Sequence, residues 1–336
     1  MTPIRAIGKY LDQPLLTAKI NKSIPALLTI GSGAVLYDTL EKTQKNKRKK
    51  VGLKTATILL ATAISAISAP KIASVLTGRQ GSKTLKQIIN YNTKNVDKFL
   101  ETHQVDEKLQ NILQKSKTKV LSLKEVNELF SSKETENIAK KLIPPPDNIK
   151  AKDIFKEIGW LSIYGAVPVA GGITGGVIAD KLTKDQWREH LPNKIKEGTY
   201  QYLANIFLCN IGAGTALAIL EKNNITSKAA RCVGMIGGII LTGVIGGSII
   251  ANYIGNKIVN PIMHQDKKET RTPELLDLTL HTDDIATVSL LSGLKWIEPS
   301  LPLLYSISGY RAGTGYRNDN HSNTNDSKKN FSHKKC

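Results

Sequence analysis

The sequence CVGMIGGIILTGVIGGSIIANYIGN, from Cys232 to Asn256, decides the fold. It runs for 25 residues without a charge between Arg231 and Lys257. Two further stretches, Ile158–Ala179 and Gly198–Leu220, are also free of charge. A helix rises about 1.5 Å per residue, so each stretch is long enough to cross a hydrocarbon core of about 30 Å. We therefore predict an all-α, polytopic membrane protein with Gly-rich transmembrane helices.

The average composition hides this pattern. Mean hydropathy is -0.19 and 22% of the residues are charged, values that suit a soluble protein. The charges, however, gather between the apolar stretches, and local windows classify such a chain better than its averages. A soluble fold, with the apolar stretches buried in a large core, is the alternative. Charge-free stretches of this length with lysines at their flanks argue against it.

The densest basic segment separates two apolar stretches near the N-terminus. The chain carries 47 Lys and Arg against 28 Asp and Glu, a net charge of +19. Aromatic residues make up only 5% and none interleaves with this segment, so it offers no platform for stacking bases. We expect no nucleic-acid partner. We expect contact with the bilayer, chiefly with anionic headgroups, through Lys45, Lys47, Arg48, Lys49 and Lys50.

Changes in charge, proline content and periodicity divide the chain into six parts. The short basic loop favours a cytoplasmic location for that turn, and the protein is expected to be a multi-pass integral membrane protein, in the cytoplasmic membrane if it is bacterial. The parts are a basic lead (1–23), an apolar helical hairpin with a basic turn (24–78), an extramembrane helical module ending in a Pro-rich spacer (79–156), a Gly-rich three-helix transmembrane unit (157–260), a helix with a broken sixth apolar segment (261–310) and a disordered polar tail (311–336). The sixth segment is open to three interpretations: a kinked span, a re-entrant segment or an interfacial helix.

Glycines recur at helical spacing inside the apolar stretches. Small residues four apart let two helix backbones approach closely in a membrane, a pattern similar to the glycine zippers of many unrelated membrane proteins. Packing within one chain, association into a homo-oligomer and the lining of a pore are the three interpretations. The residues expected to pack helices are Gly171, Gly175, Gly234, Gly238, Gly243, Gly247 and Gly255.

A second set of residues could line a transport path. Pro168 precedes a glycine pair near the middle of its stretch, and transporters use breaks in such helices to bind solutes or ions. A simple kink is the alternative. Asn205, Asn210 and Asn252 place amides inside apolar stretches, where polar groups are costly and often functional.

The sequence contains no constellation typical of catalysis. Its three cysteines lack metal-ligand spacing, and its Gly-rich stretches do not follow a strand, so no metal, cofactor or enzymatic activity is predicted. The preferred interpretation is a non-enzymatic scaffold or assembly protein packed through its glycine faces. The alternative is a small transporter or channel, with a broken helix at Pro168 and polar faces at Asn205 and Asn210.

Overall fold

The computed structural model describes residues 3–79, 83–144, 151–225, 227–265, 270–274, 277 and 299–316. All regular structure in these ranges is helical, so the predicted all-α fold class is confirmed. The helices are α1 (Pro3–Leu11), α2 (Pro14–Glu41), α3 (Arg48–Thr77), α4 (Leu85–Thr102), α5 (Glu107–Ser116), α6 (Leu123–Ser131), α7 (Glu136–Leu142), α8 (Ala151–Leu182), α9 (Trp187–Tyr202), α10 (Leu208–Lys222), α11 (Lys228–Gly238), α12 (Ser248–Ile254), α13 (Asn260–Ile262) and α16 (Leu301–Thr314).

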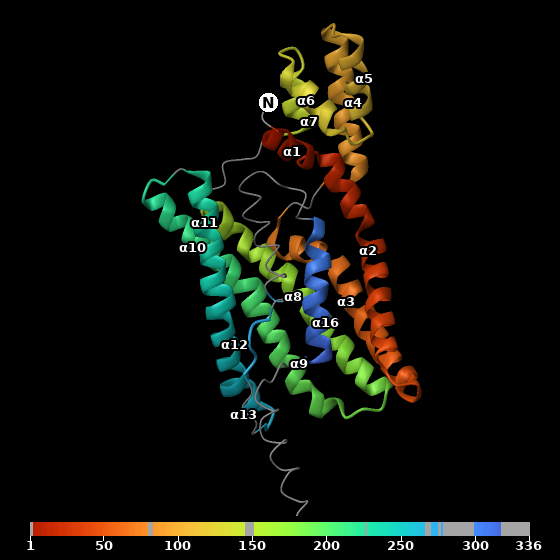
Figure 1. Ribbon diagram of the computed structural model, residues 1–336, viewed down its shortest axis with the longest axis vertical. Helices are drawn as coiled ribbons and strands as arrows, with labels where there is room; N and C mark the ends of the chain where they lie inside the picture. The colour runs from red at the N-terminus through yellow and green to blue at the C-terminus, as the bar shows by residue number, and fades with distance from the viewer. Residues whose placement is uncertain are drawn as a thin grey trace, which may run out of the picture.

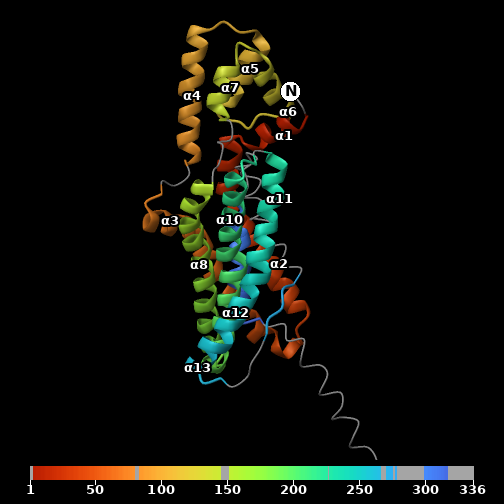
Figure 2. The same ribbon diagram turned by 90° about the vertical axis from the view of Figure 1, so that its left-hand side faces the viewer.

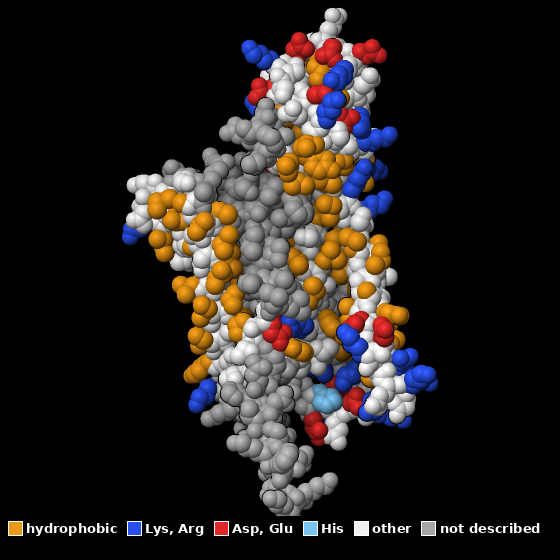
Figure 3. All heavy atoms as spheres, in the orientation of Figure 1, with side chains coloured by type: hydrophobic (Ala, Val, Ile, Leu, Met, Phe, Trp, Pro, Cys, Tyr) orange, Lys and Arg blue, Asp and Glu red, His pale blue; other side chains and the backbone are white. Residues whose placement is uncertain are grey.

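Five helices among the described residues are long and apolar enough to cross a membrane, as expected for a polytopic membrane protein. Two of them join shorter elements through π-helical turns at Leu203–Phe207, Ile239–Gly247 and Gly255–Val259. Large apolar side chains are exposed along the outer faces of these helices, between two charged ends of the molecule (Figure 3). The five spans are Pro14–Glu41, Lys45–Thr77, Glu157–Leu182, Trp187–Lys222 and Ala230–Ile262.

Helices α4 to α7 form a small module at one end of the bundle, and the turn between α2 and α3 lies at the opposite end (Figures 1 and 2). Helices α4 and α6 of this module begin with reciprocal capping boxes, Thr84 with Gln87 and Ser122 with Glu125. These boxes satisfy backbone amides that a helix start leaves unpaired. Apolar residues from all four helices form one core, including Val96, Leu113 and Leu129.

The membrane bundle has two packed groups. Helix α8 lies along α3 and α16, and α16 also packs on α9, while α10 lies along α11 and the π-helical segment that follows it. Helix α16 has 14 residues, or about 21 Å, which is too short to cross a core of about 30 Å. The C-terminal part of the sixth apolar segment is therefore a short helix buried against the bundle. Residues 278–298, which include its charged break, lie outside the described residues.

Three boundaries differ from the sequence expectation. Helix α2 begins at Pro14, inside the predicted lead, because proline is tolerated in a first helical turn. Helix α9 begins at Trp187, ahead of the charge-free stretch that starts at Gly198, and it contains Pro192 in its second turn, where the ring removes one backbone hydrogen bond. Helix α16 runs to Thr314, past position 310, where the polar tail was expected to begin. Residues 317–336 of that tail lie outside the described residues.

Candidate functional site

A network of ionised side chains lies inside the bundle, where α9, α12 and α16 meet the segment that follows the fifth span. Its members come from distant parts of the chain and are almost completely buried: Glu197 on α9 is 0% exposed, Arg271 1%, Asp277 1% and Arg311 on α16 6%. Such groups are costly to bury unless they are paired. The network is therefore the first place to look for function.

Arg271 lies at the centre of this network. Its Nε lies 3.0 Å from Glu197 Oε2 and its Nη1 lies 2.8 Å from Asp277 Oδ2. The guanidinium also stacks over the ring of Tyr200, 4.1 Å from its centroid. The planar guanidinium thus meets one carboxylate on each of two edges and an aromatic face, an arrangement that a lysine could not reproduce.

Arg311 reaches the same carboxylates from α16. Its Nη1 lies 3.3 Å from Asp277 Oδ1 and its Nε 3.7 Å from Glu197 Oε1. Its Nη2 donates to Glu274 Oε2 at 2.7 Å, and the Tyr316 hydroxyl donates to the other oxygen of Glu274, also at 2.7 Å. Burial raises the pKa of Glu274, but the hydrogen bonds from Tyr316 and Arg311 outweigh it and hold that pKa below its usual range. Two arginines therefore face three carboxylates.

A ladder of amides extends the network along α9. Gln201 Nε2 donates to Glu197 Oε1 at 2.8 Å, and Asn205 Nδ2 donates to Gln201 Oε1 at 2.9 Å. Asn205 Nδ2 also lies 3.4 Å from Asp277 Oδ1. Asn205 belongs to the π-helical turn Leu203–Phe207, and such turns are frequent at functional sites.

Asn252 holds the backbone of Arg271 from the other side. Its Nδ2 donates to the Arg271 carbonyl at 2.8 Å, and its Oδ1 accepts from the Arg271 amide, also at 2.8 Å. Irregular backbone is tolerated inside a membrane protein only where other groups satisfy its amides and carbonyls. The side chain of Asn252 does this for Arg271, so the segment around Arg271 is fixed between three helices.

The four residues proposed for a transport path therefore have different surroundings. Asn205 and Asn252 both join the ion network. Asn210 is buried and its Nδ2 donates to the Ile206 carbonyl of its own helix at 2.6 Å. Helix α8 is continuous from Ala151 to Leu182, so the break that the transporter alternative placed at Pro168 does not occur. The backbone of α16 packs there instead, since a side chain on Gly309 would overlap with the Pro168 carbonyl oxygen.

The predicted packing glycines face neighbouring helices of the same chain. A Cβ on Gly171 would overlap with Ser65, and one on Gly175 would lie 2.6 Å from Ala61 Cβ. Both neighbours belong to α3. Gly172 and Gly176 face α16 in the same way, through Gly309 and Gly313.

The glycines of the fifth span pack against α10 and against the π-helical turn Leu203–Phe207 that precedes it. A Cβ on Gly238 would overlap with the Gly212 carbonyl, one on Gly243 with Cys209, and one on Gly247 would lie 2.5 Å from the Ala204 Cα. Gly234 faces Leu220 at 2.6 Å, and Gly255 is looser, with Lys196 Cγ at 3.5 Å. These glycine contacts are made inside one chain.

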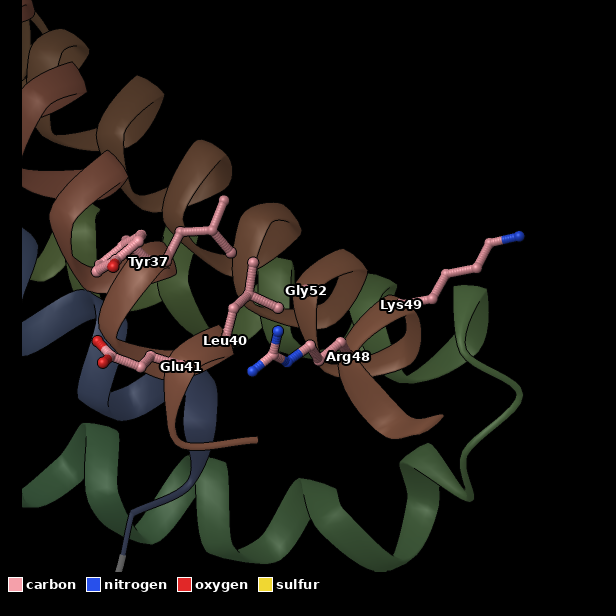
Figure 4. A pocket seen from close by; sticks show the side chains of 7 residues that line it. Tyr37, Leu40, Glu41, Arg48, Lys49 and Gly52 are labelled. Atoms are coloured by element: carbon pink, nitrogen blue, oxygen red, sulfur yellow. The ribbon is translucent and has the colours of Figure 1, made fainter. Parts of the chain in front are cut away.

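The basic turn between α2 and α3 carries some cationic side chains that are exposed and others that form ion pairs. Arg48 and Lys49 line an open groove with Tyr37, Leu40 and Gly52 between the end of α2 and the start of α3 (Figure 4). Lys45, Lys47 and Lys49 are exposed.

Lysines beyond the tip of this turn are bound to α8 and to the loop after it. Lys50 Nζ lies 2.5 Å from Asp185 Oδ1, and Lys54 Nζ lies 2.5 Å from Asp180 Oδ1. Lys194 Nζ reaches the buried Asp180 from α9 at 2.9 Å. The hydrogen bond from Lys50 lowers the pKa of Asp185 to about 2, although burial opposes the shift.

Sequence reasoning missed the ionised members of the buried network. Glu197 lies one position before the charge-free stretch that begins at Gly198, and Arg311 was placed in the polar tail. A charge directly beside an apolar helix was a signal that pointed to both residues. Nothing in the local sequence pairs Arg271 with a position 74 residues away.

Comparison with protein-family models, with curated proteins and with solved structures gives no match. Among the described residues, no group of three His, Cys, Asp or Glu side chains is arranged to hold a metal ion. The ion pairs bind the segment that carries Arg271 and Asp277 to α9 and α16, and each ionised group faces a partner of opposite charge.

Proposed function

We propose that this membrane protein is a non-enzymatic scaffold, in which a rigid bundle holds the α4–α7 module at one end. The observation that carries the proposal is the joint between α1 and α2. Gln13 Nε2 donates to the Leu121 carbonyl at 2.9 Å, and Gln13 Oε1 accepts from the Leu121 amide at 2.7 Å. Helix α2 then continues without a break into the bundle. The module is thus fixed to a membrane-length helix rather than suspended on a linker.

The interior of the bundle supports a structural role. The seven glycines expected to pack helices lie against other elements of the same chain, and the buried arginines are paired with carboxylates. A homo-oligomer of the scaffold would then form through the exposed apolar faces of α2 or of α11 and α12 rather than through the glycine ladder. The exposed cations Lys45, Lys47 and Lys49 would contact anionic headgroups at the other end.

A small transporter is the second candidate, and the ion network favours it. Buried charges, a π-helical turn at Asn205 and non-helical backbone around Arg271 are each found at the functional sites of proteins that move ions or protons. In this proposal the carboxylates of Glu197 and Asp277 would bind the transported cation when the arginines move away.

One experiment separates the two candidates. The full chain is reconstituted into sealed vesicles, and the flux of protons, alkali cations and small anions is measured beside that of empty vesicles. The scaffold proposal predicts equal flux in both. Flux above the empty control that falls in Asn205→Leu, but not in the exposed control Asn223→Leu, would refute the scaffold and support the transporter.

A further inference from the structure

The second site lies where the α4–α7 module meets the bundle, far from the ion network. A cavity of about 350 Å³ is lined there by three parts of the chain: the start of α2, the start of α4 and the end of α7. These are the places where the chain passes between module and bundle (Figures 1 and 2). The cavity has the size of a small-molecule site.

One wall of the cavity carries a hydrogen-bond acceptor with no partner in the described structure. Asn92 is 3% exposed and lines the cavity. Its Nδ2 donates to the Ser116 carbonyl at 3.0 Å, which fixes the orientation of the amide. Its Oδ1 is buried without a hydrogen-bond partner. A buried acceptor of this kind is costly, and a ligand that donates a hydrogen bond would satisfy it.

The remaining wall is charged. Lys83 and Lys141 line the cavity with exposed side chains, and Asp12 lies on the same wall, buried. Lys83 Nζ also lies 4.8 Å from the centroid of the Tyr91 ring. Two ammonium groups suit a phosphate, while the Asn92 acceptor suits an ammonium donor. Ile88 and Leu142 add an apolar lining.

The position of the cavity points to the source of such a ligand. Thr17 and Asn21 of α2 line it, and the apolar part of α2 begins at Ile24. At about 1.5 Å per residue, Asn21 lies about 5 Å and Thr17 about 10 Å beyond that apolar edge, so the cavity begins within the headgroup layer, which is about 5–8 Å deep.

We propose that this cavity binds the headgroup of a phospholipid that joins a phosphate to an ammonium donor, as phosphatidylethanolamine does. The phosphate contacts Lys83 and Lys141, and the ammonium donates to Asn92 Oδ1. A lipid bound there would bridge the three chain passages and fix the module relative to the membrane. This inference is independent of the scaffold proposal, because a transporter could carry the same site.

Native mass spectrometry of the full chain tests the proposal. The protein is purified in detergent with equal amounts of phosphatidylethanolamine and phosphatidylcholine, which have the same charge and differ in the N–H donors of the headgroup. We expect phosphatidylethanolamine to be retained about tenfold more than phosphatidylcholine, as one charge-assisted hydrogen bond predicts. Lys83→Gln with Lys141→Gln should lower the retention of both lipids, because both carry the phosphate, and Lys124→Gln, an exposed lysine of α6, should leave the retention of both unchanged.

Two results would overturn the inference. Equal retention of the two lipids, or retention of phosphatidylethanolamine that the double substitution leaves unchanged, would show that the cavity does not recognise this headgroup. Displacement of the lipid by an equal concentration of free O-phosphoethanolamine would show that the cavity takes a soluble phosphate ester instead. The substituted lysines are exposed, so the variants should fold, and their melting temperatures serve as the check.

Discussion

The buried ion network predicts a large effect for Arg271→Gln. The substitution removes the cation that lies 3.0 Å from Glu197 and 2.8 Å from Asp277. Removing one partner of a buried pair costs about 3–5 kcal/mol, because the other charge stays buried. Arg311 still faces Asp277 at 3.3 Å and Glu197 at 3.7 Å, so we expect about 3 kcal/mol, at the lower end.

The assay is thermal unfolding of the purified full chain in one detergent, with a matched surface pair as control. Arg231 Nη2 pairs with Glu221 Oε1 at 2.9 Å, and both side chains are partly exposed. Arg231→Gln should therefore cost less than about 1 kcal/mol. At about 2–4 °C for each kcal/mol, Arg271→Gln should lower the melting temperature by roughly 6–12 °C.

A double-mutant cycle identifies the source of that loss. If Glu197 and Arg271 interact directly, the double variant Glu197→Gln, Arg271→Gln should be at least about 1 kcal/mol more stable than the sum of the two single losses predicts. Equal melting temperatures for Arg271→Gln and Arg231→Gln, or strict additivity in the cycle, would refute the argument that the network is a desolvated, paired unit.

Three further predictions concern other parts of the molecule. Gly247→Leu should lower the free energy of unfolding by about 3 kcal/mol or more, because its Cβ would lie 2.5 Å from the Ala204 Cα. Gly237→Leu is the control and should be tolerated, since nothing lies within 4 Å of a Cβ at that position. Equal stability of the two variants would contradict the packing argument. The pKa of Asp185 is lowered from 3.8 to about 2, so its contribution to stability is fully present above about pH 4 and is lost as pH falls towards 2. The melting temperatures of the wild type and Asp185→Asn should therefore converge between pH 4 and pH 2. A constant difference between them would contradict this prediction. Ser122→Ala removes the hydroxyl that accepts a hydrogen bond from the Glu125 amide and should lower the free energy of unfolding by about 1 kcal/mol. Hydrogen exchange should become faster in α6 alone. Equally faster exchange across the whole module would argue against a local cap.

The membrane spans could be predicted from the sequence because the absence of charge is a local property of each stretch. Twenty-five residues without a charge between Arg231 and Lys257 leave few alternatives to a membrane helix, whatever the helix packs against. The capping box at Ser122 is a local signal of the same kind, since its donors and acceptors lie three residues apart.

The interior of the bundle did not follow from the sequence, because its contacts join distant positions. Asp277 and Arg311 are 34 residues apart, and only the return of α16 to the bundle brings them together. Pro168 left a helix break and a simple kink as alternatives, and the structure shows a continuous α8 with the small residues of α16 packed closely beside the proline.

Alkaline carbonate extraction of membranes that contain the full chain tests the central claim most directly. Five helices of membrane length with exposed apolar faces predict that the protein stays in the membrane pellet. Carbonate at high pH releases peripheral and lumenal proteins and leaves membrane-spanning proteins in the bilayer. Release into the supernatant would contradict the account, since the helices would then be packed against protein rather than lipid.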